Sequence, residues 1–545
     1  MTAAPWYKNA VFYELYVRAF YDADGDGHGD LRGLLHKLDY LQDLGVDGIW
    51  LLPIYPSPLL DDGYDVADFC GIHSDYGTLD DFKALLAAAH QRGLRVIADL
   101  VLNHTSDQHP WFQAARRARD ASWRDFYVWS DTDRGYADAR VIFTDSEPSN
   151  WAFEPLTRQY YWHRFFAHQP DLNYDNPQVQ QAMLDVVKFW LDLGVDGFRA
   201  DAAPYLFERE GTSCENLPET HAYLKRVRAF VESNYPGRVL LCEANQWPED
   251  TRAYFGDGDE FHLAFHFPLM PRIFMALARG DRQPILDILA RTPSVPETCQ
   301  WCTFLRCHDE LTLEMVTPEE RAFMWDFYAP QPRMRLNQGI RRRLAPLLGN
   351  DRRRIELAYS MLFTLPGAPT VYYGDEIGMG DNIWLDDRDG VRTPMQWTSA
   401  GNAGFSDAPA ARLYSPVVDD AAFGCRNVNV EAQRADPSSL YHAIRRMIRL
   451  RKQHASLGSG DFHIIPSDNQ AVLAYRRCHQ AETMVVVNNL TDSPQRVLLD
   501  VASLAGGRPE DVISGEALPP MTASSYPLHL EPYQTLWLRW MTNIK

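Results

Sequence analysis

The sequence predicts a protein of the α/β class. We expect a (β/α)8 TIM barrel that carries an inserted subdomain after its third strand and is followed by an antiparallel β-sandwich domain. Amphipathic helices repeatedly end at a glycine and lead into a short apolar strand, as αβ units do when they feed a parallel sheet. A long aromatic-rich stretch interrupts this rhythm, and short alternating strands replace it near the C-terminus.

The repeated unit is clearest around two glycines, Gly45 and Gly194. The chain reads DYLQDLGVDGIWL at the first and VKFWLDLGVDGFRAD at the second. Glycine is favoured just after a helix because it tolerates a positive φ. Eight strand candidates follow from such patterns, near residues 11–17, 48–52, 96–100, 197–200, 239–243, 263–267, 301–306 and 369–373. Eight strands with helices between them fit a closed barrel better than an open sheet.

The expected division of the chain has four parts. They are the first part of the barrel (1–103), the inserted B subdomain (104–175), the second part of the barrel (176–460) and the C-terminal β-domain (461–545). A further irregular stretch, 310–350, follows the seventh strand and contains the basic run GIRRRLAPLL. We expect this stretch to be a lid-like insertion.

Composition excludes several partners. The formal net charge is −20, which disfavours nucleic acid, anionic membranes and phosphorylated substrates and suits a neutral ligand such as a sugar. No apolar run approaches the ~20 residues of a membrane-spanning helix, and the N-terminus does not read as a secretory signal. The eight cysteines are scattered and form no dense framework. We therefore expect a cytoplasmic protein with no nucleic-acid or membrane partner and no organic cofactor.

Polar side chains gather at the ends of the predicted strands, where TIM barrels place their active sites. The strand ends supply Asp99, Asn103, His104, Arg199, Asp201, Glu243, His308 and Asp309. A single acidic residue after a strand is more often a helix cap than a catalyst. A set drawn from four strands is much harder to obtain by chance, so the sequence predicts acid–base chemistry at one mouth of the barrel.

These segments resemble the short motifs of the α-amylase family of glycoside hydrolases and transglycosylases. The motifs occur in the family's order, and the similarity covers nearly the whole chain. They read DLVLNH at 99–104, QPDLNYDN at 169–176, GFRAD at 197–201, CEAN at 242–245, LRCHDE at 305–310 and GAPTVYYGDEIGM at 367–379.

The resemblance implies three catalytic carboxylates. Asp201 matches the nucleophile, Glu243 the general acid/base and Asp309 the group that stabilises the transition state. A retaining mechanism needs two carboxyl groups about 5–5.5 Å apart, one ionised and one protonated. Arg199, two residues before Asp201 on the same strand face, should keep the nucleophile ionised. Crowding by the two aspartates should raise the pKa of Glu243.

The resemblance also implies which residues bind the sugar. His104 and His308 match histidines that hold its hydroxyls, and Tyr64 of DDGYDV would stack on its face. Asp61 would bind distal hydroxyls together with Arg392 of GVRTPMQW. A glucose unit held at both ends leaves no room for a longer chain, so we expect an exo-acting enzyme for small substrates. The alternative for Tyr64 is an ordinary buried aromatic residue.

One position departs from the family. The family usually has Asn before the His-Asp pair, and this chain has Cys307. The change replaces an amide donor and acceptor by a weakly polar thiol beside a catalytic carboxylate. We expect it to affect the level of activity and not the class of reaction.

Two cation sites are expected. The segment DADGDGHGD alternates carboxylates with glycines, and calcium and magnesium prefer such oxygen ligands. The expected positions are Asp22, Asp24, Asp26, His28 (through a backbone carbonyl) and Asp30. A solvated acidic turn is the alternative. By resemblance, a second calcium site between barrel and insertion would use Asn103, Asp171 and Glu208.

Within the family, several segments resemble the members that interconvert maltose and trehalose in one active site. They lie at 12–34, 310–316, 333–354 and 380–397. The implied reaction is cleavage of maltose, a covalent glucosyl-Asp201 intermediate, reorientation of the freed glucose and return attack, with minor hydrolysis.

An occluding lid would suppress that hydrolysis, and residues 104–175 and 310–350 are the predicted lid. The alternatives are a hydrolytic exo-acting α-glucosidase or oligo-1,6-glucosidase, a sucrose-acting transglucosylase, and a non-catalytic barrel that serves as a binding module. A homodimer or a homotetramer is compatible with the sequence.

Overall fold

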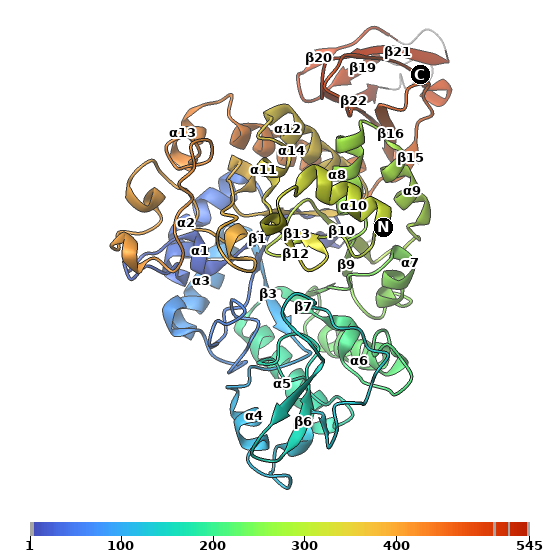
Figure 1. The fold of residues 1–545 in the computed structure, drawn as a ribbon. Coiled ribbons are helices and arrows are strands. Elements are labelled where there is room, and N and C mark those ends of the chain that lie inside the picture. Colours follow the sequence, from blue (N-terminus) through green and yellow to red (C-terminus); the bar gives the residue numbers. More distant parts are fainter. Residues whose placement is uncertain (1–4, 505–507, 521–523, 542–545) are drawn as a thin grey trace.

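The structure, a computed structural model, describes residues 5–504, 508–520 and 524–541. The ends of the predicted first and last parts, residues 1–4 and 542–545, lie outside the described residues, as do 505–507 and 521–523 of the predicted C-terminal domain. Figure 1 shows the barrel in the middle of the molecule, the insertion at one end and the C-terminal domain at the opposite end.

Eight parallel strands close into a barrel in the order β1-β14-β10-β9-β8-β7-β3-β2. They are β1 (Phe12–Leu15), β2 (Gly48–Leu51), β3 (Arg95–Val101), β7 (Gly197–Asp201), β8 (Val239–Cys242), β9 (Leu263–Phe265), β10 (Gln300–Phe304) and β14 (Ala368–Tyr372). Each strand coincides with one of the eight predicted segments. Their side chains are almost all buried, as expected for parallel strands covered by helices. The predicted fold class is confirmed.

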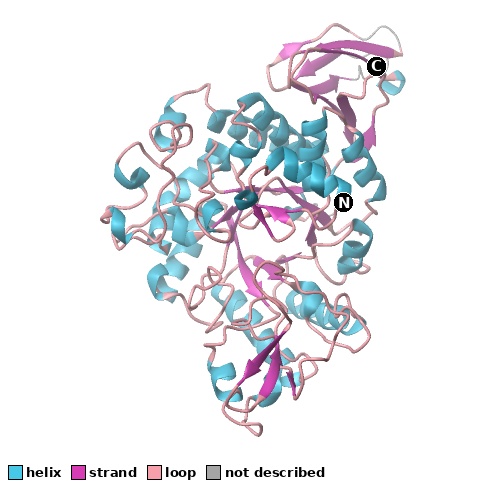
Figure 2. Ribbon diagram, viewed as in Figure 1, coloured by secondary structure: helices cyan, strands magenta, loops and turns pink. Residues whose placement is uncertain are grey.

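Helices surround the barrel (Figure 2). The longer ones are α2 (Leu31–Leu44), α3 (Leu79–Gln91), α5 (Pro177–Leu193), α6 (Pro218–Asn234), α8 (Leu269–Arg279), α9 (Gln283–Arg291), α12 (Arg352–Thr364) and α14 (Leu440–Gln453). The two glycine stops are confirmed, because Gly45 and Gly194 have φ values of 95° and 110°. Among the described residues, no helix has the length and apolar character that crossing a membrane requires.

The insertion follows β3, as predicted, and lies between it and α5. It contains α4 (Pro110–Ala115) and a small antiparallel sheet of β4 (Trp129–Ser130), β6 (Gln159–Trp162) and β5 (Trp151–Glu154). Trp151 and Trp162 pack edge to face in a small core of their own. The aromatic residues that broke the sequence pattern therefore stabilise a compact lobe beside the barrel.

The stretch after β10 also has structure of its own. It contains β11 (Leu311–Thr312), α10 (Pro318–Tyr328), β12 (Arg335–Leu336), β13 (Gly339–Ile340) and α11 (Leu344–Leu347), and the three strands form one antiparallel sheet. A capping box at Thr317 and Glu320 begins α10. The segment 310–350 is thus a folded element attached to the mouth of the barrel.

The C-terminal domain consists of two antiparallel sheets. The larger has the order β15 (Asp461–Ile464), β16 (Val472–His479), β17 (Glu482–Asn489), β22 (Thr535–Met541), β19 (Arg508–Asp511) and β20 (Glu516–Ala517), and the smaller pairs β18 (Gln495–Asp500) with β21 (Ser525–Leu530). Their inner side chains share one core, which makes a sandwich. Pro527 lies within β21 and cannot donate to its ladder, which a strand of this two-stranded sheet can tolerate.

Candidate active site

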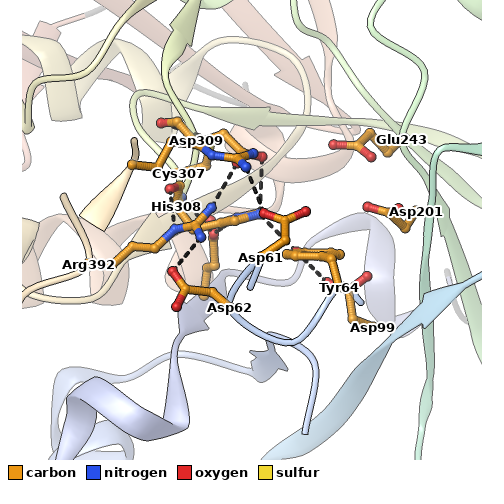
Figure 3. Close-up of polar contacts among 12 residues, drawn as sticks. Asp61, Asp62, Tyr64, Asp99, Asp201, Glu243, Cys307, His308, Asp309 and Arg392 are labelled. Atoms are coloured by element: carbon orange, nitrogen blue, oxygen red, sulfur yellow. Dashed lines mark hydrogen bonds and ion pairs between the residues drawn. The ribbon is translucent and has the colours of Figure 1, made fainter. Parts of the chain in front are cut away.

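The predicted residues converge on one small cavity at the carboxyl ends of the barrel strands. Asp201 ends β7, Glu243 follows β8, and His308 and Asp309 follow β10. The cavity has a volume of about 130 Å³, below the ~300–1,000 Å³ typical of ligand pockets. Seven predicted residues line it: Asp61, Tyr64, His104, Asp201, Glu243, His308 and Asp309. Figure 3 shows Asp201 and Glu243 next to each other, across the site from His308 and Asp309.

One buried guanidinium holds the pair of carboxylates. Arg199 donates from Nη1 to Oδ1 of Asp201 at 2.5 Å and to Oδ1 of Asp99 at 2.8 Å. Its Nη2 forms an ion pair with Glu243, which also accepts a hydrogen bond from the backbone of Ala202 at 3.1 Å. Because a single guanidinium contacts both side chains, Asp201 and Glu243 are near neighbours, as the ~5 Å spacing of a retaining pair requires.

The two carboxylates differ in their readiness to ionise. Burial raises the pKa of Asp201 to about 6, against the lowering effect of Arg199. Burial also raises the pKa of Glu243, to about 7, with smaller contributions from Asp201 and Asp309. The predicted direction and the predicted contribution of the two aspartates are confirmed, and burial is the larger cause. Near neutral pH one group is mostly ionised and the other is partly protonated.

The pair of His308 and Asp309 carries opposite charges. Burial alone would lower the pKa of His308, but Asp309 and Glu14 raise it to about 9. Its Nε2 lies 3.1 Å from Oδ2 of Asp309. Burial would raise the pKa of Asp309, but His308 and two arginines hold it well below its usual range. Asp309 is therefore a fixed negative charge opposite Asp201 and Glu243.

Two side chains of the cavity are suited to bind neutral hydroxyls. Burial lowers the pKa of His104 to about 3, so the ring is neutral, and its Nε2 has no hydrogen-bond partner within the part of the chain that the structure describes. Tyr64 stacks on His308 with an interplanar angle of 13°, and its hydroxyl lies 2.8 Å from Nε2 of that ring. Tyr64 is buried, as its alternative interpretation states, but it also lines the cavity.

Asp61 and Arg392 are predicted to bind distal hydroxyls together, but their side chains form hydrogen bonds with other residues. Asp61 instead accepts a hydrogen bond from Arg388 at 2.7 Å. Arg392 donates to Oδ2 of Asp62 at 2.6 Å and to Oδ1 of Asp309 at 3.0 Å. Figure 3 shows the Arg392 guanidinium next to Asp62, and Arg392 is not among the residues that line the cavity. A 3-10 turn, Asp389–Val391, separates Arg388 from Arg392, so the two arginines point in different directions.

Arg388 is the main residue that the sequence interpretation missed. It lines the cavity and donates to both Asp61 and Asp309, the latter at 2.9 Å. Its guanidinium also lies 5.3 Å from the ring centre of Phe143 in the insertion. The sequence shows a second arginine four residues before Arg392, in DDRDGVR. Loops lack the periodic pattern of helices and strands, so the sequence does not tell which of the two arginines faces the site.

Further lining residues come from the insertion and from the stretch after β10. They include Ile142, Phe143 and Phe165 on one side and Glu310, Thr312 and Glu314 on the other. Asn245 donates to Thr312 at 3.2 Å, and its Oδ1 is buried without a partner among the described residues. This end of the cavity is thus partly apolar, with a few polar atoms free to bind a ligand.

Cys307 is buried below the cavity beside Glu14. Its Sγ lies 4.0 Å from the carbonyl of Asp309, which is a weak contact. Glu14 binds the backbone and ring of His308 through Oε1, while its Oε2 is buried without a partner among the described residues. The negative charge of Glu14 helps to raise the pKa of the thiol, although burial is the larger cause. The thiol thus contacts Asp309, and the second carboxylate oxygen of Glu14 stays unsatisfied among the described residues.

The two expected cation sites differ in the oxygen ligands that they offer. In the loop of residues 22–30, carboxylate oxygens of Asp22, Asp24 and Asp30 lie within 4.8 Å of one another. Asp26 is not in this group, and its carboxylate accepts a hydrogen bond from the backbone of His28. The His28 ring contacts Arg18 and not the loop carboxylates. The loop can offer three acidic ligands.

The second expected site contains three unsatisfied oxygens. Oδ1 of Asn103, Oδ2 of Asp171 and Oε1 of Glu208 are all buried without a hydrogen-bond partner in the described residues. Burial raises the pKa of Asp171 to about 8 and raises that of Glu208 well above its usual value. Hard cations prefer such oxygen ligands, so these residues fit calcium.

A closed barrel that joins paired carboxylates, a buried arginine and a small neutral-sugar cavity defines an enzyme that acts on glycosidic bonds. The family model described as "Alpha amylase, catalytic domain" matches residues 14–317 and 335–460, and "Maltogenic Amylase, C-terminal domain" matches 462–537. The chain belongs to the α-amylase family. The match leaves out residues 318–334, which contain α10 of the lid-like segment.

Known proteins of this family differ in how similar they are to the chain. The trehalose synthase/amylase TreS of Mycobacterium tuberculosis is 57% identical over 545 residues, which cover 99% of this chain and 91% of that protein. An oligo-1,6-glucosidase of Parageobacillus thermoglucosidasius is 31% identical, with 89% and 91% covered. A solved structure of an inactive MutB double mutant in complex with isomaltulose superposes with a TM-score of 0.80 at 28% identity, covering 99% of this chain and all of that one.

Proposed function

We propose that this protein interconverts maltose and trehalose by intramolecular transglucosylation, with minor hydrolysis to glucose. The observation that carries the proposal is the 57% identity to a trehalose synthase over nearly the full length of both chains. The oligo-1,6-glucosidase, whose name describes the alternative activity, is far less similar. The small cavity favours a short substrate over a long chain.

We assign the chemistry to the two neighbouring carboxylates. The Asp201 carboxylate attacks C1 of the non-reducing glucosyl unit of maltose, while protonated Glu243 gives its proton to the departing O4. This leaves a glucosyl ester on Asp201 and a free glucose. The glucose then turns, Glu243 takes the proton of its anomeric hydroxyl, and that oxygen attacks C1 to form trehalose. Two inversions retain the α configuration.

The surrounding charges support these roles. Arg199 contacts both carboxylates and favours the ionised form of Asp201. Positive charge that develops on the sugar ring is stabilised by the fixed negative charge of Asp309. Neutral His104 and charged His308 can bind the hydroxyls of the same ring, and Asp61 with Arg388 can bind its far end. That far-end pair closes the cavity and favours an exo-acting enzyme.

Exclusion of water is assigned to the insertion and the segment 310–350, which meet over the cavity. Arg140 of the insertion donates to Glu314 at 2.8 Å. Asp145 of the insertion accepts a hydrogen bond from the backbone of Asn337 at 2.7 Å. Both parts also line the cavity. A joint made by two polar contacts can open to admit maltose and close while the freed glucose turns.

We propose structural cations at the two oxygen-rich sites. Calcium held by Asn103, Asp171 and Glu208 would satisfy three buried oxygens and tie the insertion to the barrel. Calcium or magnesium would bind the carboxylates of Asp22, Asp24 and Asp30. Both ions would stabilise loops, and neither takes part in the chemistry at Asp201.

Location and assembly are also proposals. None of the eight cysteines, all of which are described, forms a disulfide, which supports a reducing compartment such as the cytoplasm. The homodimer or homotetramer stays a prediction, and light scattering of the purified protein measures it.

Incubation with maltose, followed by chromatographic separation of the products, tests the function. Trehalose should be the main product, glucose should be minor, and trehalose supplied alone should return maltose. Isotopically labelled free glucose added to the reaction should not enter the product, because the freed glucose stays in the site. Glucose as the sole product would replace this function by the hydrolytic one. Equal inactivity of the wild type and of Asp201→Asn would indicate a binding module.

A further inference from the structure

The arginine run at residues 341–343 connects the lid-like segment to the chain that follows β14. Arg343 is fully buried and donates to the carbonyl of Tyr373 at 2.7 Å. Arg342 forms an ion pair with Asp381 at 2.9 Å. Arg341 reaches furthest along this chain, because its Nη1 donates to the carbonyls of Leu385 at 2.9 Å and Asp387 at 2.6 Å. Three consecutive residues thus fix three successive points of one loop.

The last of these points is a strained position. Asp387 has a φ of 38°, a left-handed conformation that is strained for a residue with a side chain. Such a conformation persists only where surrounding contacts hold it. Arg341 supplies one such contact at the Asp387 carbonyl. Nε of Arg341 is itself fixed, by a hydrogen bond of 2.7 Å to the carbonyl of Arg333 within the segment 310–350.

The residue after the strained position is Arg388, which binds both sides of the cavity. The Asp387 carboxylate pairs with Arg388 at 3.3 Å. Arg388 in turn contacts Asp61 at 2.7 Å and Asp309 at 2.9 Å. Its side chain is only 7% exposed, so a shift of the backbone cannot be absorbed by a change of rotamer into solvent. The direction of Arg388 therefore depends on the conformation of Asp387.

We propose that Arg341 is a positioning residue for the reaction: it holds the left-handed backbone at Asp387 so that Arg388 spans Asp61 and Asp309. Arg341 itself does not line the cavity. The proposal rests on the proposed function only for the identity of the sugar that Asp61 and Arg388 bind. It also makes the segment 310–350 a part of the sugar-binding machinery at both of its ends, at Glu314 and at Arg341.

The proposal predicts a change in pH dependence that mere loss of stability would not cause. Burial raises the pKa of Asp61 to about 7, and Arg388 is the strongest group that opposes this rise. If Arg388 moves away, the pKa of Asp61 rises further, and the carboxylate is ionised only at higher pH. The other groups that face Asp61 are Arg392, Asp387, Asp65 and the amide of Gln169.

The experiment compares Arg341→Met with Arg335→Met in the full-length protein. Arg335 lies in the same segment, but its guanidinium donates to the carbonyl of Ala329 inside that segment and does not reach the loop. The rate of maltose consumption is measured, because it counts hydrolysis and isomerisation together. The measurement is repeated from pH 6 to pH 9. Arg341→Met should raise KM at pH 7 about 10- to 100-fold, with a smaller change in kcat.

Two further readouts complete the test. The KM of Arg341→Met should fall as the pH rises from 7 to 9, and its pH profile should lie on the alkaline side of the wild-type profile. Arg341→Lys, which keeps a charged donor, should recover part of the loss. Wild-type KM in Arg341→Met would overturn the proposal, and so would equal losses in both methionine variants or an unshifted pH profile. Each result holds whether the product is trehalose or glucose, so it is separate from the test of the reaction.

Discussion

Replacing Glu314 by glutamine should raise the fraction of maltose lost to hydrolysis. The change keeps the shape of the side chain and removes the charge that pairs with Arg140 at 2.8 Å. The Glu314 side chain is 15% exposed and that of Arg140 is 37% exposed, so the pair lies between a surface ion pair and a buried one. Surface pairs contribute about 0–1 kcal/mol and hydrogen bonds to charged groups about 1.5–3 kcal/mol, so we take about 1 kcal/mol here.

That free energy sets the expected size of the effect. Since about 1.4 kcal/mol corresponds to a factor of ten, the open form of the lid should become about fivefold more populated. The ratio of glucose to trehalose at early times, measured by chromatography, should rise by about the same factor. Glu319→Gln is the control, because Glu319 is an exposed glutamate of the same segment. The reasoning is refuted if the ratio stays unchanged both in Glu314→Gln and in the double variant with Asp145→Asn.

Three other outcomes can be measured. The profile of kcat/KM against pH should be bell-shaped. Activity is lost below about pH 6, where Asp201 takes up a proton, and above about pH 7, where Glu243 loses the proton that it must donate. A flat profile from pH 5 to 9 contradicts the assignment. Cys307→Asn should raise kcat/KM about tenfold, because an amide can donate to the unsatisfied oxygen of Glu14, and an unchanged or lower value would exclude that explanation. Chelation of calcium should lower Tm by about 5–10 °C, and Asp171→Asn should abolish this sensitivity; equal Tm shifts in both proteins would place the ion elsewhere.

The barrel could be predicted from the sequence because its signals are local. A glycine such as Gly45 or Gly194 ends a helix by its own conformational freedom, and the apolar run that follows can only be buried. Once eight strands are assigned, closure of the barrel brings their ends together. The convergence of Asp201, Glu243 and Asp309 follows from topology, without knowledge of any loop.

The parts that failed depend on loops and on burial. Which of Arg388 and Arg392 faces the sugar is decided by a short 3-10 turn, and no periodic pattern encodes it. The sequence interpretation named the two aspartates that help to raise the pKa of Glu243 but missed burial, the larger cause. Neighbouring charges can be guessed from the motifs, whereas the exclusion of water depends on the insertion and the stretch after β10, which pack over the site.

The contact between Arg140 and Glu314 joins two stretches that lie more than 170 positions apart in the chain, and neither residue is needed for bond cleavage. Substitutions at this contact can therefore change the ratio of isomerisation to hydrolysis while the catalytic carboxylates stay the same. Enzymes that share the same catalytic residues can therefore differ in the fraction of substrate that they hydrolyse.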